Sequence, residues 1–279
     1  MAIAIRVWMG PWAAAAPGAG GIHIAPAIGE REAITARYQL QWLEIFAGYA
    51  VDAVPALLFF LLAVMVLCLW PFDRTDRAYP WLAAALLLSG IQRGNQAFFF
   101  WWEIETVEAF VVLILALTAS SSLGAWMMAW RGWFKEDRPA WLPKTVAALT
   151  LLLMLAQVLG RPWLFAAVFP HSAVVAVRSL ITGVRLAFLL VLMVIVHRGI
   201  RRQGREACYA LPAVLAIGVV LFPSELAAVH VRGIWFPWGV GLSLSECASV
   251  VFDALLFILL VRRLWGHARH APATAAGVG

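Results

Sequence analysis

The chain has 279 residues, of which 63% are hydrophobic and 13% are charged, and its mean hydropathy is +0.86. Soluble domains carry about 25% charged residues, so this composition excludes an ordinary water-soluble domain and indicates a protein embedded in a lipid bilayer. The formal net charge is +6. The basic residues lie in short loops between long apolar segments, where they orient membrane helices, so we expect the bilayer and no nucleic acid as a partner.

Seven apolar segments are long enough to cross a hydrocarbon layer about 30 Å thick as helices. We expect these spans at residues 46–70, 79–101, 107–130, 145–161, 173–196, 207–229 and 242–264. The predicted fold class is therefore all-α: a polytopic membrane protein with a seven-transmembrane helix bundle.

The chain divides into three parts by composition. Residues 1–44, rich in glycine and proline, are expected to form an extracytoplasmic N-terminal segment, with a short amphipathic helix at 30–41 leading into the first span. Residues 45–265 hold the seven spans. Residues 266–279, rich in alanine and glycine, are expected to form a disordered cytoplasmic tail.

The distribution of lysine and arginine predicts the orientation of the bundle. Most of these residues follow the first, third, fifth and seventh spans: Arg74, Arg77, Arg131, Lys135, Arg138, Lys144, Arg198, Arg201, Arg202, Arg205, Arg262, Arg263 and Arg269. Cytoplasmic loops are enriched in lysine and arginine, so we expect the N-terminus outside and the C-terminus in the cytoplasm. The expected location is the cell inner membrane.

Several kinds of catalytic or cofactor chemistry are excluded by the motifs. Both lysines, Lys135 and Lys144, lie in a predicted loop, so no span offers a Schiff-base lysine for retinal. The metalloprotease motif HExxH, the hydrolase motif GxSxG and phosphate-binding glycine loops are absent. His171 and His230 stand singly near the outer surface, which does not fit paired haem ligands. We expect no cofactor, no metal and no enzymatic activity.

Charged residues within the predicted spans indicate where a polar site would lie, because an ion at the bilayer centre costs at least about 2.5–3.5 kcal/mol. Arg178 and Arg185 are two helical turns apart in the fifth span, and Glu246 and Asp253 are two turns apart in the seventh. Both spans run in the same direction. We therefore expect a polar ladder in which Arg178 lies near Glu246, Arg185 lies near Asp253, and Glu225 of the sixth span lies at the outer rung.

Three interpretations of this ladder are open, and the third is a proton relay. The charges form ion pairs that fix helix packing, or they line a cavity, open outward, that binds a small polar or anionic ligand. Arg93 of the second span is interpreted either as a partner of Asp52 or Glu225, or as a ligand contact. The candidate ligand-binding residues are Arg93, Asn95, Arg178, Arg185, Glu225, Glu246 and Asp253.

The stretch Pro223-Ser224-Glu225 falls inside the sixth predicted span. Proline removes a backbone hydrogen bond and kinks a helix. We interpret the stretch as an ordinary membrane kink or as an opening that faces a cavity. The run 118–124 contains small and hydroxyl side chains, and this composition favours close packing between helices.

Two parts of the chain resemble a known family. Residues 5–8 (IRVW), 18–21 and 26–29 look like the end of the extracellular jelly-roll domain of bacterial seven-transmembrane receptors with diverse intracellular signalling modules. Residues 234–257 (IWFPWGVGLSLSECASVVFDALLF) are similar to the last helices of sensors that precede PP2C-like phosphatase or diguanylate cyclase domains. The resemblance covers about residues 4–264.

This resemblance implies a membrane sensor or receptor module that passes an extracytoplasmic cue to a cytoplasmic effector. The chain departs from the family because only a remnant of the jelly-roll domain precedes the spans, and no output domain follows Trp265. Either the chain is a truncated product, or the effector is a separate cytoplasmic chain. A second copy in a homodimer is a further expected partner. The alternative function is a small-molecule transporter or channel.

Overall fold

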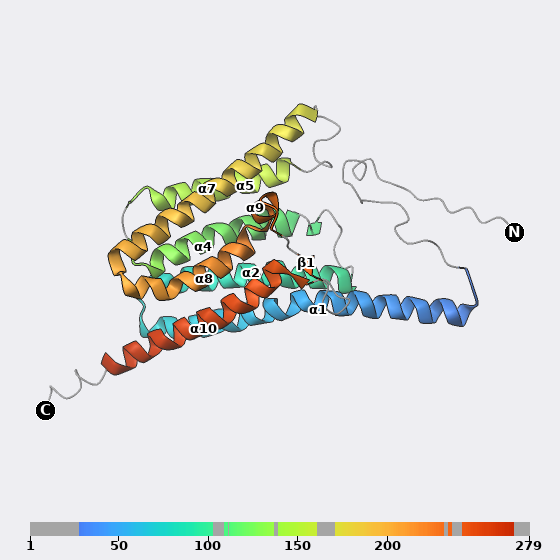
Figure 1. The fold of residues 1–279 in the computed structure, drawn as a ribbon, viewed down its shortest axis with the longest axis horizontal. Helices are drawn as coiled ribbons and strands as arrows, with labels where there is room; N and C mark the ends of the chain where they lie inside the picture. Colours follow the sequence, from blue (N-terminus) through green and yellow to red (C-terminus); the bar gives the residue numbers. More distant parts are fainter. Residues whose placement is uncertain are drawn as a thin grey trace.

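The computed structural model describes residues 28–102, 109–110, 112–136, 139–160, 171–231, 234–235 and 242–270. These residues form long helices packed side by side, with one very short strand pair (Figure 1). The helices are α1 (Arg31–Leu69), η2 (Trp70–Phe72), α2 (Ala78–Trp102), η3 (Val112–Ala119), α4 (Ser120–Trp133), α5 (Leu142–Leu159), α7 (His171–Gln203), α8 (Arg205–Leu221), α9 (Pro223–Ala228) and α10 (Leu244–His270).

The two strands form a small hairpin before the last helix. Strand β1 (Ile234–Trp235) pairs antiparallel with β2 (Leu242–Ser243), with Ile234 opposite Ser243. The hairpin leads directly into α10, so it fixes where that helix begins. It is the only departure from helix in the fold class expected from the sequence, within the described part of the chain.

Five helices of the described chain are long and apolar enough to cross a membrane: Arg31–Phe72, Val112–Trp133, Leu142–Leu159, Ser172–Gln203 and Leu244–Trp265. The chain is therefore a multi-pass helical membrane protein. Helix α2 has 25 residues but carries the polar side chains Gln92, Arg93 and Asn95, which lower its hydropathy. The apolar part of α8, Ala207–Leu221, is shorter than the other spans.

The first and last helices run beyond their predicted bounds. Helix α1 starts at Arg31, so the short helix expected at 30–41 is continuous with the first span. It extends well past the other helices (Figure 1). Helix α10 continues to His270, so residues 266–270, expected in a disordered tail, are helical. Residues 1–27, which include most of the expected jelly-roll remnant, and residues 271–279 lie outside the described residues.

One end of the bundle, which we call the basic end, collects most of the positive charge. It contains the α1–α2, α4–α5 and α7–α8 turns and the C-terminal turns of α10 (Figure 1). Its described basic residues are Arg74, Arg77, Arg131, Lys135, Lys144, Arg198, Arg201, Arg202, Arg205, Arg262 and Arg263. The clustering of these residues at one end, predicted from the sequence, is confirmed for them; Arg138 lies outside the described residues.

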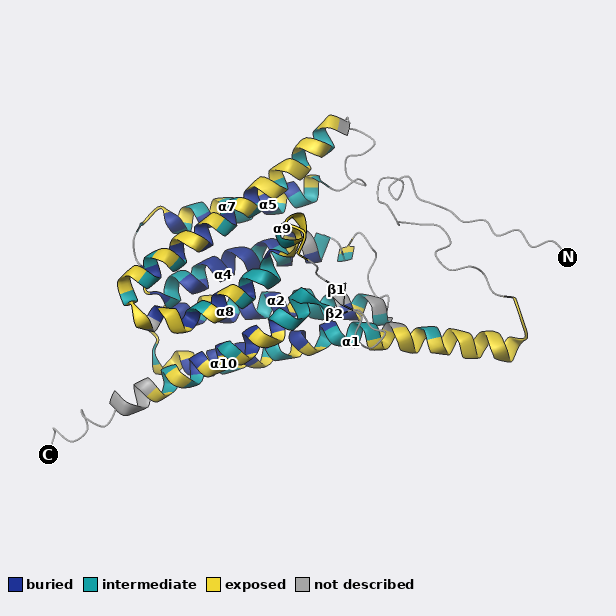
Figure 2. Cartoon of the chain, in the orientation of Figure 1, coloured by how far each residue is buried: buried dark blue, intermediate teal, exposed yellow. Residues whose placement is uncertain are grey.

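Helix α4 lies at the centre of the bundle, packed against α2, α5 and α7 (Figure 2). Most of its residues are buried, including Trp126 and Trp130. Small side chains allow this close approach: a Cβ added at Gly124 would lie 2.3 Å from Thr150 Oγ1, and one at Gly132 would lie 2.8 Å from the Cα of Ala78. The close packing predicted for the run 118–124 is therefore confirmed at Gly124. The outward faces of α1, α5 and α7 are exposed and apolar, as lipid contact requires (Figure 2).

Candidate functional site

A polar cavity of about 420 Å³ lies in the half of the bundle away from the basic end. At 1.5 Å per helical residue, its lining residues on α1, α2, α4, α5, α7 and α8 lie roughly 15–27 Å along their helices from that end, and Glu246 lies near the opposite end of α10. Every long helix of the described chain contributes to the wall. The polar lining side chains are Asp52, Arg93, Arg185, Glu246, Gln92, Gln157, Ser89, Ser224, Ser243 and Ser245.

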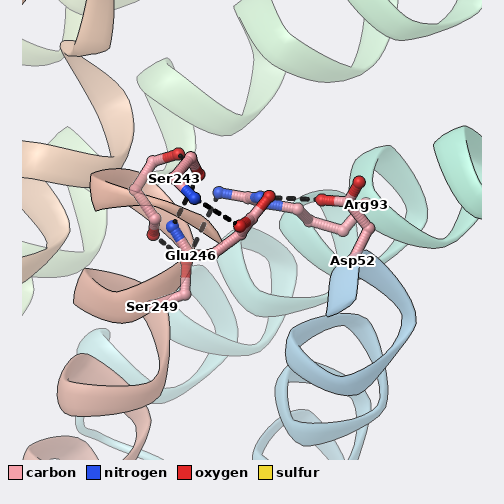
Figure 3. A network of polar contacts seen from close by, with 6 residues as sticks. Asp52, Arg93, Ser243, Glu246 and Ser249 are labelled. Atoms are coloured by element: carbon pink, nitrogen blue, oxygen red, sulfur yellow. Dashed lines mark hydrogen bonds and ion pairs between the residues drawn. The ribbon is translucent and has the colours of Figure 1, made fainter. Parts of the chain in front are cut away.

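Arg93 joins three helices at one side of the cavity (Figure 3). Its Nη1 donates to Asp52 Oδ1 of α1 at 3.1 Å, and its Nη2 donates to Ser249 Oγ of α10 at 3.4 Å. The side chains of Arg93 and Asp52 are only 14% and 9% exposed. The interpretation of Arg93 as a buried partner of Asp52 is confirmed. Its role as a ligand contact stays a prediction, supported by its place in the cavity wall.

Arg185 of α7 stabilises the break between helices α8 and α9. Helix α8 ends at Leu221, Phe222 leaves the helical conformation, and Pro223 starts the short helix α9. Arg185 of α7 donates from Nε and Nη2 to the two carboxylate oxygens of Glu225, at 2.6 and 2.8 Å, and from Nη2 to the carbonyl oxygen of Leu221 at 2.8 Å. The guanidinium thus satisfies a carbonyl beside the break, as interrupted membrane helices require.

The interruption faces the cavity, because Pro223 and Ser224 both line it. Of the two interpretations of Pro223-Ser224-Glu225, the opening toward a cavity is therefore confirmed. The ordinary-kink interpretation is wrong, since the helix does not continue through the proline but ends and restarts.

The polar ladder between the fifth and seventh predicted spans is wrong. Arg185 pairs with Glu225 rather than with Asp253, and Arg178 is exposed and lies outside the cavity wall. The physical reason is the order of the helices: α10 packs mainly against α8 and α1, whereas α7 packs against α5, α4 and α8. Helix α8 therefore lies between the two helices that the ladder would join.

Glu246 has a structural role that the sequence already signals. Its Oε2 accepts from the backbone N–H of Ser243 at 2.7 Å, and Ser243 Oγ accepts from the N–H of Glu246 at 3.1 Å (Figure 3). This reciprocal pair is a capping box, and the pattern Ser-x-x-Glu at residues 243–246 is its signature. Glu246 also lines the cavity, so one carboxylate both begins α10 and faces the polar space.

Asp253 lies deeper on the same helix. Glu246, Ser249 and Asp253 are three and four residues apart, so they share the face of α10 that meets Arg93. Asp253 is 4% exposed, and neither carboxylate oxygen has a hydrogen-bond partner among the described residues. It lies within electrostatic range of Arg93. Asn95, two residues beyond Arg93, is not among the described residues that line the cavity.

Gln157, Ser89 and Ser245 line the wall but were not predicted from the sequence. Gln157 of α5 is the one polar residue in the apolar stretch 151–159, which is the signal that would have indicated it, whereas Ser89 of α2 lies just before the polar residues Gln92 and Arg93. Ser245 is close to the capping box and donates to or accepts from Ser243 Oγ at 2.8 Å. Only the packing of the helices shows that these side chains face one space.

The floor of the cavity is tied to the core of α4. Ser89 Oγ lies 2.9 Å from Ser122 Oγ and accepts from Trp126 Nε1 at 3.0 Å. From Trp126, stacked rings continue toward the basic end through Trp130, 6.3 Å away between centroids, and Phe134, a further 6.2 Å away. All three rings are fully or almost fully buried.

Ion pairs close the basic end. Arg263 of α10 pairs with Asp76 of the α1–α2 turn, and its guanidinium lies over the rings of Trp133 and Tyr79 at 4.7 and 5.1 Å. Arg198 of α7 pairs with the buried carboxylate of Glu136. These contacts join the ends of four helices to the turns between them.

Comparison with known proteins finds no matching protein-family model, no matching curated protein and no matching solved structure. In the described residues, no group of three or more histidine, cysteine, aspartate and glutamate side chains is placed to hold a metal ion. The function must therefore be argued from the cavity.

Proposed function

We propose that this chain is the sensor module of a bacterial signalling system. A small polar ligand enters the cavity from outside the inner membrane, the helices around it shift, and a separate cytoplasmic effector or a second copy of the chain responds at the basic end. The resemblance to seven-transmembrane receptors belongs to the same proposal.

The proposed topology has seven spans. Five of these are the long apolar helices, and the other two are α2 and the interrupted pair α8–α9. Both pack within the bundle and connect its opposite ends. The basic end is assigned to the cytoplasm because positive charge gathers in cytoplasmic loops. This places the start of α1 and the cavity toward the outside.

The observation that carries the proposal is a polar cavity whose floor is continuous with a packed core. Below Ser89, the bundle is filled by Trp126, Trp130 and Phe134 rather than by a polar path. Such a floor favours binding and transmission over passive conduction. A change at Ser89 would be passed on through rigid, contacting rings, which is the kind of network that carries coupling between distant sites.

The test uses the purified full chain in lipid nanodiscs and a library of small amines, carboxylates, amino acids and sugars. A compound that binds the native state raises the melting temperature in a saturable way. We expect such a compound not to raise the melting temperature of Gln157→Leu, because this change replaces a polar side chain of the wall with an apolar one of similar size. The matched control is Glu32→Gln on the exposed start of α1, which should bind normally.

A second readout separates sensing from mere binding. Spin labels at Thr75 and Lys135, both exposed at the basic end, report the distance between the α1–α2 and α4–α5 turns. The proposal expects this distance to change when the compound binds. A bound compound that leaves the distance unchanged would contradict the proposed signalling.

Transport is the alternative, and one observation favours it. The break between α8 and α9 beside the cavity resembles the discontinuous helices that hold substrates in transporters. Accumulation of the radiolabelled compound in proteoliposomes would favour transport over sensing. We expect binding without accumulation.

A further inference from the structure

From the charges around the cavity, we infer that its ligand is a small organic cation that carries an ammonium group. The inference rests on the proposed binding function and specifies the chemical class of the ligand. It differs from the polar or anionic ligand expected from the sequence, because the structure shows which charges are already paired.

The two arginines of the wall are each paired with a carboxylate. Arg185 uses Nε and Nη2 on Glu225 and on the carbonyl of Leu221. Arg93 uses both terminal nitrogens, one on Asp52 and one on Ser249. Each arginine charge is thus already balanced by a carboxylate, and an anion bound at the remaining N–H groups would add a negative charge to a buried site that has no further cation among its described residues.

Two carboxylates remain after these pairs are formed. Glu246 lines the cavity and makes no ion pair with a described residue. It lies in the first turn of α10, where the backbone N–H of Ser243 donates to it. Asp253 lies deeper on the same face of α10 and is not among the described residues that line the cavity; it is buried, and neither carboxylate oxygen has a hydrogen-bond partner among the described residues. The described polar cluster therefore carries more negative than positive groups, and a positive ligand would balance it.

The size of the cavity indicates an organic molecule rather than a bare ion. Its volume of about 420 Å³ falls in the range of small-molecule sites and far exceeds the roughly 30 Å³ share of one water molecule. The described residues also contain no group of three or more histidine, cysteine, aspartate or glutamate side chains that could hold a metal ion. Among the described residues, the cavity therefore favours an organic molecule over a metal ion.

The wall also offers the acceptors that an ammonium group needs. An ammonium group has three hydrogen-bond donors and no acceptor. Glu246, Ser245 and Gln157, whose side chains all carry oxygen acceptors, line the same cavity. One carboxylate and two neutral oxygens would satisfy the donors of a primary amine.

The test compares compounds that share a carbon skeleton but differ in charge. The probes are 3-aminopropanol, 1,3-propanediol and 3-hydroxypropionate, followed by a panel of larger hydroxy- and aryl-substituted primary amines with their alcohol and carboxylate counterparts. Binding to the full chain in neutral-lipid nanodiscs is measured by melting temperature and by titration calorimetry. We expect saturable binding by amines and none by the matching carboxylates.

Two variants locate the charge. Glu246→Gln keeps the capping box, because glutamine also fits the third helical position, but removes the negative charge. Asp253→Asn removes the deeper charge without changing the size of the side chain. We expect each variant to weaken amine binding at least about tenfold, that is by about 1.4 kcal/mol, and to melt at the same or a higher temperature than the parent without ligand. Glu32→Gln, far from the cavity, should bind like the parent.

The outcomes separate this inference from the proposed function. Binding by a carboxylate or a neutral compound that depends on Gln157 overturns the inference and leaves the sensor proposal standing. Amine binding without movement of the basic end supports the inference and contradicts the sensor proposal. Stabilisation by acid alone, abolished in Asp253→Asn, identifies the missing cation as a proton and overturns the inference. Absence of binding by every class overturns both.

Discussion

A buried charge in this bundle pairs with a residue on an adjacent helix, and equal depth in the membrane is not enough to bring two charges together. Asp52 lies in α1 and Arg93 in α2, and these two helices are sequence neighbours that pack along much of their length, so the pairing was among the alternatives predicted. Arg185 was expected to meet Asp253 but meets Glu225, because α8 and α9 separate α7 from α10. The depth of a residue in the membrane can be counted from its position in the sequence, whereas the sequence does not show which helices are neighbours.

A double-mutant cycle tests the pairing of Arg185. Replacing either Arg185 or Glu225 with alanine leaves a buried charge unpaired and should cost about 3–5 kcal/mol of unfolding free energy. Since both variants lose the same contact, the double variant should cost less than the sum, with a coupling of about 0.5–3 kcal/mol. The measurement is unfolding in mixed micelles with increasing denaturing detergent.

The matched control is the pair predicted from the sequence. Arg185→Ala and Asp253→Ala share no contact in the structure, so their effects should add within about 0.5 kcal/mol. A strong coupling between Arg185 and Asp253, with additivity between Arg185 and Glu225, would contradict the observed arrangement.

At the scale of the helices, local sequence signals explain where elements begin and end. Pro223 marks the restart of the helix after α8, and Ser243 with Glu246 marks the start of α10. The contacts between helices depend instead on small residues whose partners lie far away in the sequence. Gly199 of α7 is one of these, because a Cβ there would lie 2.6 Å from Cγ of Phe134.

Two glycines of α7 provide a matched test of this contact. Gly199→Ala should lower the unfolding free energy by about 1–3 kcal/mol, because the added methyl group overpacks the buried ring of Phe134. Gly183→Ala has open space within 4 Å and should be neutral or stabilising by up to about 1 kcal/mol, since alanine favours the helix. The same detergent unfolding measures both. Equal effects of the two substitutions would show that α7 does not pack against Phe134 as observed.

At the scale of the whole molecule, the bundle has two unlike ends. The basic end is closed by ion pairs and aromatic rings, and the other half holds the polar cavity. The sensor proposal needs the basic end to face the cytoplasm, since an effector must reach it. Orientation is therefore the first property of the whole molecule to measure.

Cysteine labelling tests the orientation. The three native cysteines are first replaced by alanine, and a single cysteine is then placed at Thr75 in the basic end or at His230 near the opposite end, both exposed. In intact cells, a membrane-impermeant maleimide should label His230→Cys, while Thr75→Cys should react only after the membrane is permeabilised. The reverse pattern would place the basic end outside and contradict the proposed direction of signalling.

The amino-acid sequence alone predicts that this protein lies in a lipid bilayer, that it is helical and that its basic residues gather at one end. These follow from hydropathy, length and charge, which are local properties that a bilayer sorts directly. It also indicated that Arg93, Arg185, Glu225, Glu246 and Asp253 matter, because buried charge is costly wherever the helix lies. The packed structure is needed to show which charges pair, which polar side chains share the cavity and which carboxylates have no partner. These features depend on the order and rotation of the helices in the bundle. Lipid is as apolar as the helix surfaces, so hydropathy does not determine which helix packs against which.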